Sequence, residues 1–372
     1  MPSNEDDYYR YIEYLQQQTL DEDWRPAFDS SKWMDWVAKN RERLEKMSQF
    51  TVGADGLSLV TRFERSVQGF IPTTPFEVPT TKAIFEPILS EVTQAAAKLG
   101  IRPVRPIEIA TSTDSCASPA SRPTTEDHLL FIGLGTSSFC NYWAKCITAV
   151  ARAIAPAIGF NRVESPKDLE IVFRQDPSGI ILAARLCLYY AVFGTMIGFG
   201  DVQQRDTYLP YRLQLLHAME VFSVAHEYAH FISEERIQQF TGSLEPSQSQ
   251  QLEFFCDELG LAISRECESA ANNYLIFAGI GALVFFRAIQ VCESIRELLV
   301  NSGLKGVRQN KSSDSHPSPE ERIIAIKSQV CTKTAPDQQL EVQQFVEEYD
   351  TILRAIVSAA VAVVNSACCQ KP

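Results

Sequence analysis

The apolar residues of the chain recur most regularly over residues 211–241, where they keep the spacing expected of a helix. No proline or glycine interrupts this stretch. Its apolar series is Leu213, Leu216, Met219, Phe222, Val224 and Phe231. A second stretch, QLEFFCDELGL at residues 251–261, is similarly apolar. The pattern therefore predicts two helices, the first of them apolar on every side as on a buried helix.

The N-terminal third of the chain shows shorter patterns. Residues 5–48 predict two amphipathic helices that pack on the core. Residues 71–81 are rich in proline and threonine and predict a linker. Residues 82–99 predict a helix that Gly100 ends.

The next segment predicts strands and a helix. Residues 107–109 suit a short strand, and the Ser/Thr/Pro-rich residues 111–127 predict a mobile loop. Residues 128–134 suit a strand and residues 137–154 a helix. The alternating residues 169–173 and 180–193 predict two further strands.

A long uncharged run lies after the second apolar stretch. Residues 269–286 hold 18 uncharged residues in a row, which is at the lower limit for a membrane span. Asn272 and Asn273 within the run and Arg287 directly after it favour a buried core helix within residues 272–299. A membrane span stays open as the less favoured alternative.

These elements predict an α+β fold that is mainly helical, with a small sheet over the helix that contains residues 221–232. We expect an N-terminal helical region at residues 1–70 and a main domain at residues 80–330. Residues 338–369 are expected to close the chain as a helix packed on the core.

The candidate chemistry lies inside the first predicted helix. His226, Glu227 and His230 form an H-E-x-x-H pattern. Residues four apart lie on one face of a helix, so the two imidazoles can hold one metal ion while Glu227 reaches a water on that ion. The alternative is a polar pair on a helix surface. The apolar surroundings argue against it, because buried imidazoles and a carboxylate are costly without a partner.

Catalytic zinc takes three protein ligands and one open position, so a third ligand is needed. Glu234 lies about 12 Å of helical rise from His226, too far to share one ion. The metzincin arrangement is excluded, because Ser233 and Arg236 stand where it needs glycine and histidine. Glu253 is the candidate ligand on the second helix.

Asp257, four residues after Glu253, is the candidate acceptor for the ring N–H of a ligand histidine. The alternative is two acids on a solvated helix face. Their neighbours Leu252, Phe254 and Phe255 are apolar, which fits that alternative poorly.

This arrangement resembles the gluzincin metallopeptidases. The segment E-x-x-C-D-x-x-G is similar to E-x-x-A-D-x-x-G of the HtpX and CAAX-prenyl-protease type, with Cys256 in place of a small residue. The segment SHPSPEERI at residues 315–323 is similar to the S/T-H-P-x-x-x-x-R segment of that family. The matches span residues 209–327 and leave the N-terminal third uncovered.

The resemblance implies roles for several residues. It makes Glu253 the third zinc ligand, Asp257 its supporting acid, His316 a stabiliser of the tetrahedral intermediate and Arg322 a support for His316. It also implies that an edge strand of the sheet before the metal helix pairs with extended substrate backbone.

Charge and cysteine content limit the partners and the cellular compartment that we expect for this protein. The net charge of −12 argues against nucleic acid and anionic membrane surfaces as partners. The acidic start MPSNEDDYYRY has no apolar segment typical of a secretory signal. The ten cysteines include no C-x-x-C pair and predict reduced thiols rather than a disulfide framework. We therefore expect a cytoplasmic protein.

The predicted function is a zinc-dependent metallopeptidase that hydrolyses peptide bonds of a protein or peptide substrate, with Zn²⁺ as cofactor and Glu227 as general base. One alternative is a zinc-dependent amidohydrolase with a non-peptide substrate. The other is a catalytically silent regulatory protein that keeps zinc for stability. Glu227 argues against the silent protein, because a purely structural site needs no base.

Overall fold

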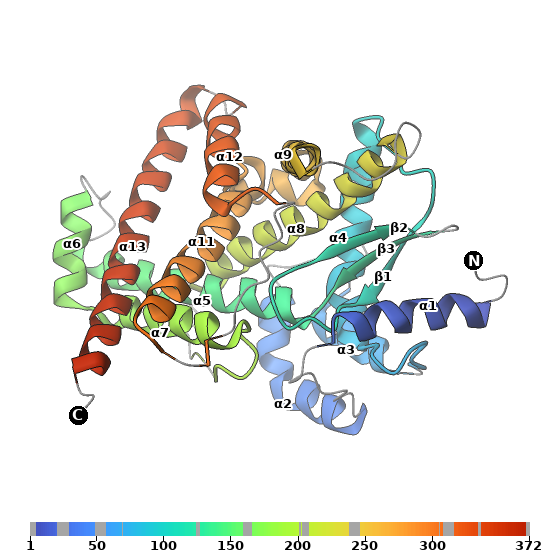
Figure 1. The fold of residues 1–372 in the computed structure, drawn as a ribbon, viewed down its shortest axis with the longest axis horizontal. Coiled ribbons are helices and arrows are strands. Elements are labelled where there is room, and N and C mark those ends of the chain that lie inside the picture. The colour runs from blue at the N-terminus through green and yellow to red at the C-terminus, as the bar shows by residue number, and fades with distance from the viewer. Residues whose placement is uncertain are drawn as a thin grey trace.

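Helix α8 (Leu209–Ile237) runs through the centre of the molecule, between the sheet and the surrounding helices (Figure 1). The computed structural model describes residues 5–20, 30–48, 57–68, 70–123, 127–158, 166–200, 202, 208–237, 246–304, 306–307, 316–333 and 336–369. Within α8, every residue from 218 to 233 is buried. The helix is buried on all sides because its residues are apolar on all sides, as the sequence predicts.

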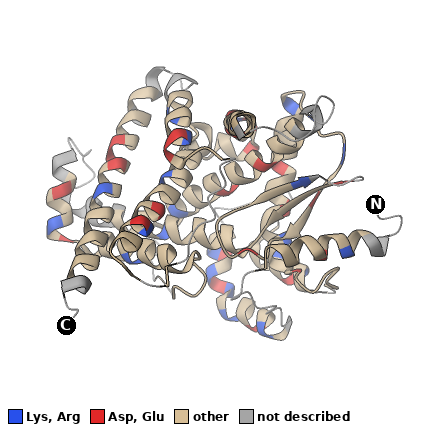
Figure 2. Cartoon of the chain, in the orientation of Figure 1, with Lys and Arg blue, Asp and Glu red and all other residues tan. Residues whose placement is uncertain are grey.

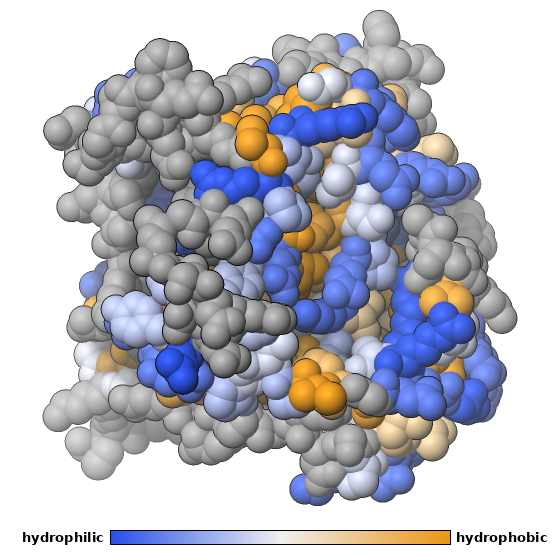
Figure 3. Space-filling model, turned by 90° about the vertical axis from the view of Figure 1, so that its right-hand side faces the viewer, coloured by the Kyte–Doolittle hydropathy of each residue, from blue (hydrophilic) through white to orange (hydrophobic). Residues whose placement is uncertain are grey.

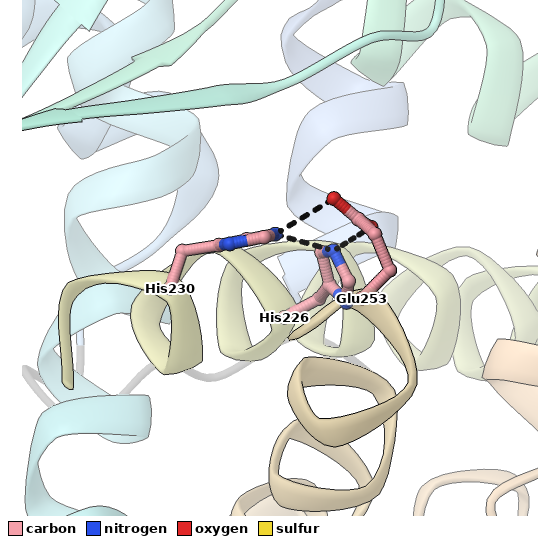
Figure 4. A group of neighbouring side chains, drawn as sticks. All are labelled: His226, His230 and Glu253. Atoms are coloured by element: carbon pink, nitrogen blue, oxygen red, sulfur yellow. Dashed lines mark hydrogen bonds and ion pairs between the residues drawn. The ribbon is translucent and has the colours of Figure 1, made fainter. Parts of the chain in front are cut away.

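Helix α9 (Pro246–Glu266) packs against α8 and crosses it, which confirms the second predicted helix (Figure 4). The chain then continues through the short 3₁₀ helix Glu268–Ala271, α10 (Tyr274–Phe277) and α11 (Ile280–Asn301). The buried core helix expected within residues 272–299 is therefore present as α11, and the short α10 precedes it as a separate helix.

Two local features separate α10 and α11 in this segment. The side-chain oxygen of Asn273 accepts a hydrogen bond from the backbone N–H of Leu275 and so caps α10. Gly279 then adopts a left-handed conformation with φ of 74° directly before α11. Most residues from 275 to 286 are buried, which confirms the expected core location of this run.

The sheet has three strands in the order β1-β3-β2. β1 (Ile107–Thr111) runs parallel to β3 (His128–Ile132), and β2 (Ala120–Pro123) runs antiparallel to it. The central strand β3 carries no Lys, Arg, Asp or Glu, as expected of a strand covered on both faces (Figure 2). β2 corrects the prediction of a loop over residues 111–127. Its pairing with β3 is a tertiary contact that the local composition does not reveal.

Alternate residues of β3 face two different layers. Leu130 and Ile132 join the main core, and His128 stacks on Phe231 of α8 with ring centroids 4.6 Å apart. Leu129 and Phe131 pack instead with α1 (Glu5–Gln18), which covers the outer face of the sheet. The sheet therefore lies over α8, as predicted.

Buried polar contacts tie α1 to the sheet. The side-chain amide of Gln16 donates to the carboxylate of Glu77 and to the backbone carbonyl of Thr111, both at 2.9 Å. Glu77 also accepts from the backbone N–H and the hydroxyl of Thr111. All three residues are buried, so the network fixes the end of α1 against the end of β1.

Of the remaining N-terminal helices, the first and the last lie close to their predicted bounds, and the short helix between them is not predicted. α2 (Ser30–Ser48) packs on α3 (Leu59–Val67), and α3 packs on α4 (Pro79–Lys98). α4 begins three residues earlier than predicted, because Pro79 is suited to the first turn of a helix. Gly100 follows its end with φ of 73°, as expected.

α5 (Leu134–Ile158) confirms the predicted helix, whereas the two predicted strands after it are wrong. Residues 169–173 lie in α6 (Pro166–Gln175), and residues 180–193 lie in α7 (Ser178–Phe193). α7 packs against α5, α11 and α13, so apolar residues on several of its sides are buried. A short apolar run buried on all sides looks alike in sequence whether it is a strand or a helix.

The chain closes with α12 (Pro319–Lys333) and α13 (Pro336–Cys369), and the latter confirms the predicted final helix. Among the described helices, Val342–Ser366 is long and apolar enough to cross a membrane, and 39% of its most apolar window is buried. α6 and α7 pass the same test only as a pair bent by 89°. Figure 3 shows the side of the molecule that lies on the right in Figure 1. On this side, apolar side chains are exposed between hydrophilic ones.

Candidate metal centre

Two helices bring three potential metal ligands together (Figure 4). His226 and His230 lie one turn apart on α8, and Glu253 reaches them from α9. The Nε2 atoms of the two histidines are 3.1 Å apart. The carboxylate oxygens of Glu253 lie 3.4 Å from Nε2 of His226 (Oε2) and 3.4 Å from Nε2 of His230 (Oε1). The spacing predicted from sequence is therefore confirmed as a three-dimensional cluster.

These distances fit a metal ion. The three donor atoms all lie within 4.8 Å of one another. Zinc with tetrahedral ligands at about 2.0–2.1 Å places neighbouring donors about 3.3 Å apart. The cluster, buried at His226 and Glu253 and nearly so at His230, can hold a metal ion. Its two imidazoles and one carboxylate are also a donor set that catalytic zinc uses.

Asp257 orients the first histidine. Its Oδ1 atom lies 3.0 Å from Nδ1 of His226. A carboxylate at Nδ1 holds the proton on that nitrogen and leaves the lone pair of Nε2 turned toward the other ligands. Asp257 thus lies where the sequence predicts the supporting acid.

Arg322, near the start of α12, neutralises the acids of the site. Its Nε and Nη2 atoms donate to the two carboxylate oxygens of Asp257 at 2.8 and 2.6 Å. Its Nη1 atom lies 3.3 Å from Oε2 of Glu253, and its guanidinium stacks over the ring of Phe286 at 4.1 Å. Buried carboxylates need such a partner, and the planar fork of arginine supplies two bonds to one of them.

His316 lies at the rim of the cluster. Its Nε2 atom is 3.2 Å from Oε1 of Glu253, while 60% of its side chain is exposed. The polar residues 305–318 predict a loop that delivers His316, and most of this stretch lies outside the described residues. Its ring is positioned to reach both the solvent and the ligand group.

Glu227 follows the first ligand directly and is buried, with 6% exposure. Burial raises the pKa of its carboxyl, and the positive charges of His226 and Arg322 oppose this effect. Its carboxylate makes no hydrogen bond with any other residue in the described part of the chain. The group is therefore available to a bound water or substrate.

The pKa values of the three candidate ligands are shifted by burial and by the charges that the ligands exert on one another. Burial and Arg322 lower the pKa of His226, but hydrogen bonds to Asp257 and Glu253 outweigh them and raise it to about 9. Burial and the charge of His226 lower the pKa of His230 to about 3. Burial opposes ionisation of Glu253, yet its bond to His226 and the charges of both histidines lower its pKa to about 2. The carboxylate is thus ionised and His230 neutral, the forms that bind metal, whereas His226 has to release its second proton before an ion binds at Nε2.

Gly260 lets α9 approach α8 at the site. It follows Glu253 and Asp257 at helical spacing, so all three lie on one face of α9. A Cβ atom at Gly260 would lie 3.0 Å from the backbone nitrogen of His226. The sequence contains this glycine in its E-x-x-C-D-x-x-G segment, but spacing alone does not reveal that it meets His226.

The two remaining histidines of the chain, His128 and His217, lie outside the cluster. His128 is buried against Phe231, as described above, and Nε2 of His217 lies 3.6 Å from a carboxylate oxygen of Glu91 on α4. Cys256, which departs from the family pattern, is buried, with its Sγ atom 3.7 Å from the hydroxyl of Ser233. A small apolar residue at this position suits the packing of α9 on α8.

No protein-family model matches the chain, and neither a curated protein nor a solved structure matches it significantly.

Proposed function

We propose that this protein is a zinc-dependent metallopeptidase of the gluzincin type. The observation that carries the proposal is the cluster of His226, His230 and Glu253, whose donor atoms are spaced at 3.1 and 3.4 Å. Glu227, buried and adjacent to the first ligand, supplies the acid–base group that a purely structural site does not need.

A bound zinc ion would supply a water of near-neutral pKa and polarise the substrate carbonyl. Glu227 then accepts a proton from the attacking water and passes it to the leaving amine. His316 donates a hydrogen bond to the oxygen that becomes negative in the transition state. Asp257 and Arg322 hold His226 and Glu253 in place while charge develops.

The edge strand β2 supports a peptide as the substrate. β2 pairs with β3 on one side and packs against α8, which carries the two histidines and Glu227. An extended peptide can add to the open edge of such a strand through backbone hydrogen bonds. The two strands predicted at residues 169–173 and 180–193, directly before the metal helix, cannot supply the pairing edge, because these residues are helical.

A protein or peptide substrate in the cytoplasm fits the acidic composition and the free thiols of the described cysteines. A zinc amidohydrolase with a non-peptide substrate uses the same ligand chemistry and differs only in the substrate groove. The peptide is favoured because β2 offers a backbone edge beside the site.

Metal analysis together with a peptide digest tests the proposal. We expect the purified protein to bind about one zinc per chain. The zinc-loaded protein should cleave members of a random peptide library, and a chelator should stop the cleavage. Zinc binding without cleavage of any peptide would favour an alternative function, and the absence of zinc binding would contradict the site itself.

A further inference from the structure

Phe286 of α11 supports the arginine that neutralises the acids of the metal centre. The guanidinium carbon of Arg322 lies over the Phe286 ring, 4.1 Å from its centroid. Phe286 is 5% exposed and the side chain of Arg322 is 11% exposed. A cation over an aromatic face is attracted by the negative potential of that face, and the attraction is larger when water is excluded. Phe286 therefore offers Arg322 an interaction that an aliphatic side chain cannot supply.

The aromatic support extends to the first candidate ligand. Phe222, one turn before His226 on α8, makes an edge-to-face contact with Phe286, with ring centroids 5.6 Å apart and an interplanar angle of 77°. The centroid of Phe222 also lies 6.0 Å from that of His226. Phe286 belongs to α11, which packs against both α8 and α12. One buried ring thus connects the helix of the two histidines with the helix of Arg322.

The guanidinium of Arg322 has competing contacts, so its orientation matters to the site. Its Nη2 atom donates to Oδ1 of Asp257 at 2.6 Å and also lies 3.3 Å from each ring nitrogen of His226. Nε2 of His226 is the atom that faces the other two candidate ligands. A guanidinium that turned further toward Nε2 would place its positive charge where the metal ion has to bind. The attraction to the Phe286 ring opposes this turn, because the turn moves the cation off the ring face.

We propose that Phe286 is a positioning residue of the metal centre, which acts through Arg322 by a cation–π contact. The ring keeps the guanidinium on the carboxylates of Asp257 and Glu253, and Asp257 in turn orients His226. The inference rests on the metal site of the proposed function and does not depend on cleavage of any substrate. It adds an aromatic residue of the core helix α11 to the residues that determine zinc affinity.

Graded fluorination of the Phe286 ring tests the inference, because fluorine withdraws negative potential from the ring face while the shape of the side chain changes little. Phenylalanine with one, two or three ring fluorines replaces Phe286, and competition with a chelator of known affinity measures zinc binding. We expect the affinity to fall stepwise, to about three- to tenfold below the wild type with three fluorines. Phe286→Leu, which keeps an apolar side chain but no ring, should bind zinc at least as weakly as the trifluorinated protein.

Phe285, the neighbouring residue on α11, is the matched control. It is also 5% exposed and makes edge-to-face contacts with Phe139 and Phe286. Among the described residues, however, the ring that lies under Arg322 is that of Phe286. The same fluorinated residues at Phe285 should leave zinc affinity unchanged. Urea unfolding of every protein shows that each is folded and separates a change in stability from a change in affinity.

The outcomes separate this inference from the proposed function. Equal zinc affinity of the wild-type and trifluorinated Phe286 proteins overturns the role of the ring and leaves the peptidase untouched. An equal loss on fluorination of Phe285 overturns it as well, because zinc affinity would then follow core packing. A stepwise loss confined to Phe286, in a protein that cleaves no peptide, supports the role of the ring and contradicts the peptidase. If the wild-type protein binds no zinc, both are refuted.

Discussion

Gly260 of α9 lies against the backbone of His226 on α8, so that a Cβ at Gly260 would stand 3.0 Å from the nitrogen and 3.1 Å from the Cα atom of His226. Few side chains tolerate such a contact. The absence of a side chain at this one position therefore sets how closely the helix of Glu253 approaches the helix of the two histidines.

Gly260→Ala is expected to weaken both the fold and the metal site. A better helix propensity favours alanine by about 1 kcal/mol. Overpacking against helix backbone costs about 1–3 kcal/mol, and it prevails here because the backbone of α8 is buried and cannot move aside. Urea unfolding and zinc titration measure the two effects, with Glu258→Ala on the exposed face of α9 as control. An unchanged zinc affinity would show that the close approach does not position Glu253.

Loss of any one ligand should abolish stoichiometric zinc binding. His226→Ala, His230→Ala and Glu253→Ala each leave two protein ligands where catalytic zinc needs three. His217→Ala is the matched control, because this histidine lies on the same helix but pairs with Glu91 outside the cluster. Elemental analysis after dialysis gives the metal content. Full occupancy in Glu253→Ala, combined with loss in Asp257→Ala, would reverse the assignment of the third ligand.

Asp257→Asn should lower zinc affinity about 10–100-fold without removing the site. The amide keeps the shape of the side chain but loses the charge that fixes the proton on Nδ1 of His226 and that pairs with Arg322. Competition with a chelator of known affinity measures the change. Glu258→Gln, on the exposed face of the same helix, is the control and should bind zinc like the wild type.

Glu227→Gln should abolish hydrolysis while zinc content and melting temperature stay at wild-type values. Glutamine keeps the volume of the side chain but cannot accept a proton, and the loss of a general base costs about two to four orders of magnitude in rate. Glu220→Gln changes another buried acid of the same helix and should remain active. Wild-type activity in Glu227→Gln would remove this residue from the mechanism.

The buried carboxyl of Glu220 should make stability depend on pH. Burial raises its pKa to about 8, whereas the unfolded carboxyl titrates near about 4.3. Between these values the folded state keeps a proton that the unfolded state has lost. The stabilising effect is therefore complete below the unfolded pKa and declines as pH rises toward 8, on the order of 1 kcal/mol per pH unit.

Glu220→Gln tests this dependence, because glutamine resembles the protonated acid and does not titrate. The free energy of unfolding of the variant, measured with urea at several pH values, should match that of the wild type at about pH 4 and exceed it by a growing amount as pH rises to about 8. All other titrating groups are the same in both proteins, so the difference isolates Glu220. Parallel pH profiles of the two proteins would show that this carboxyl is not held protonated in the fold.

Much of the metal centre is predictable because its spacing is local. His226 and His230 share a helix face at a separation of four residues, and so do Glu253 and Asp257. The apolar residues around both pairs predict buried helices, which the structure confirms. The donor types then follow from residue identity alone, since two imidazoles and a carboxylate favour a metal of the zinc class. The identity of the metal and the peptidase activity stay predictions.

The tertiary structure decided what depends on contacts between distant parts of the chain. α7 is a helix rather than a strand because helices surround it, and β2 forms because β3 offers an edge for it to pair with. The partnership of Arg322 with Asp257, and the meeting of Gly260 with His226, depend on which helix faces pack together. Sequence spacing determines which side chains share a face, but only the burial of those faces against one another determines which of them meet.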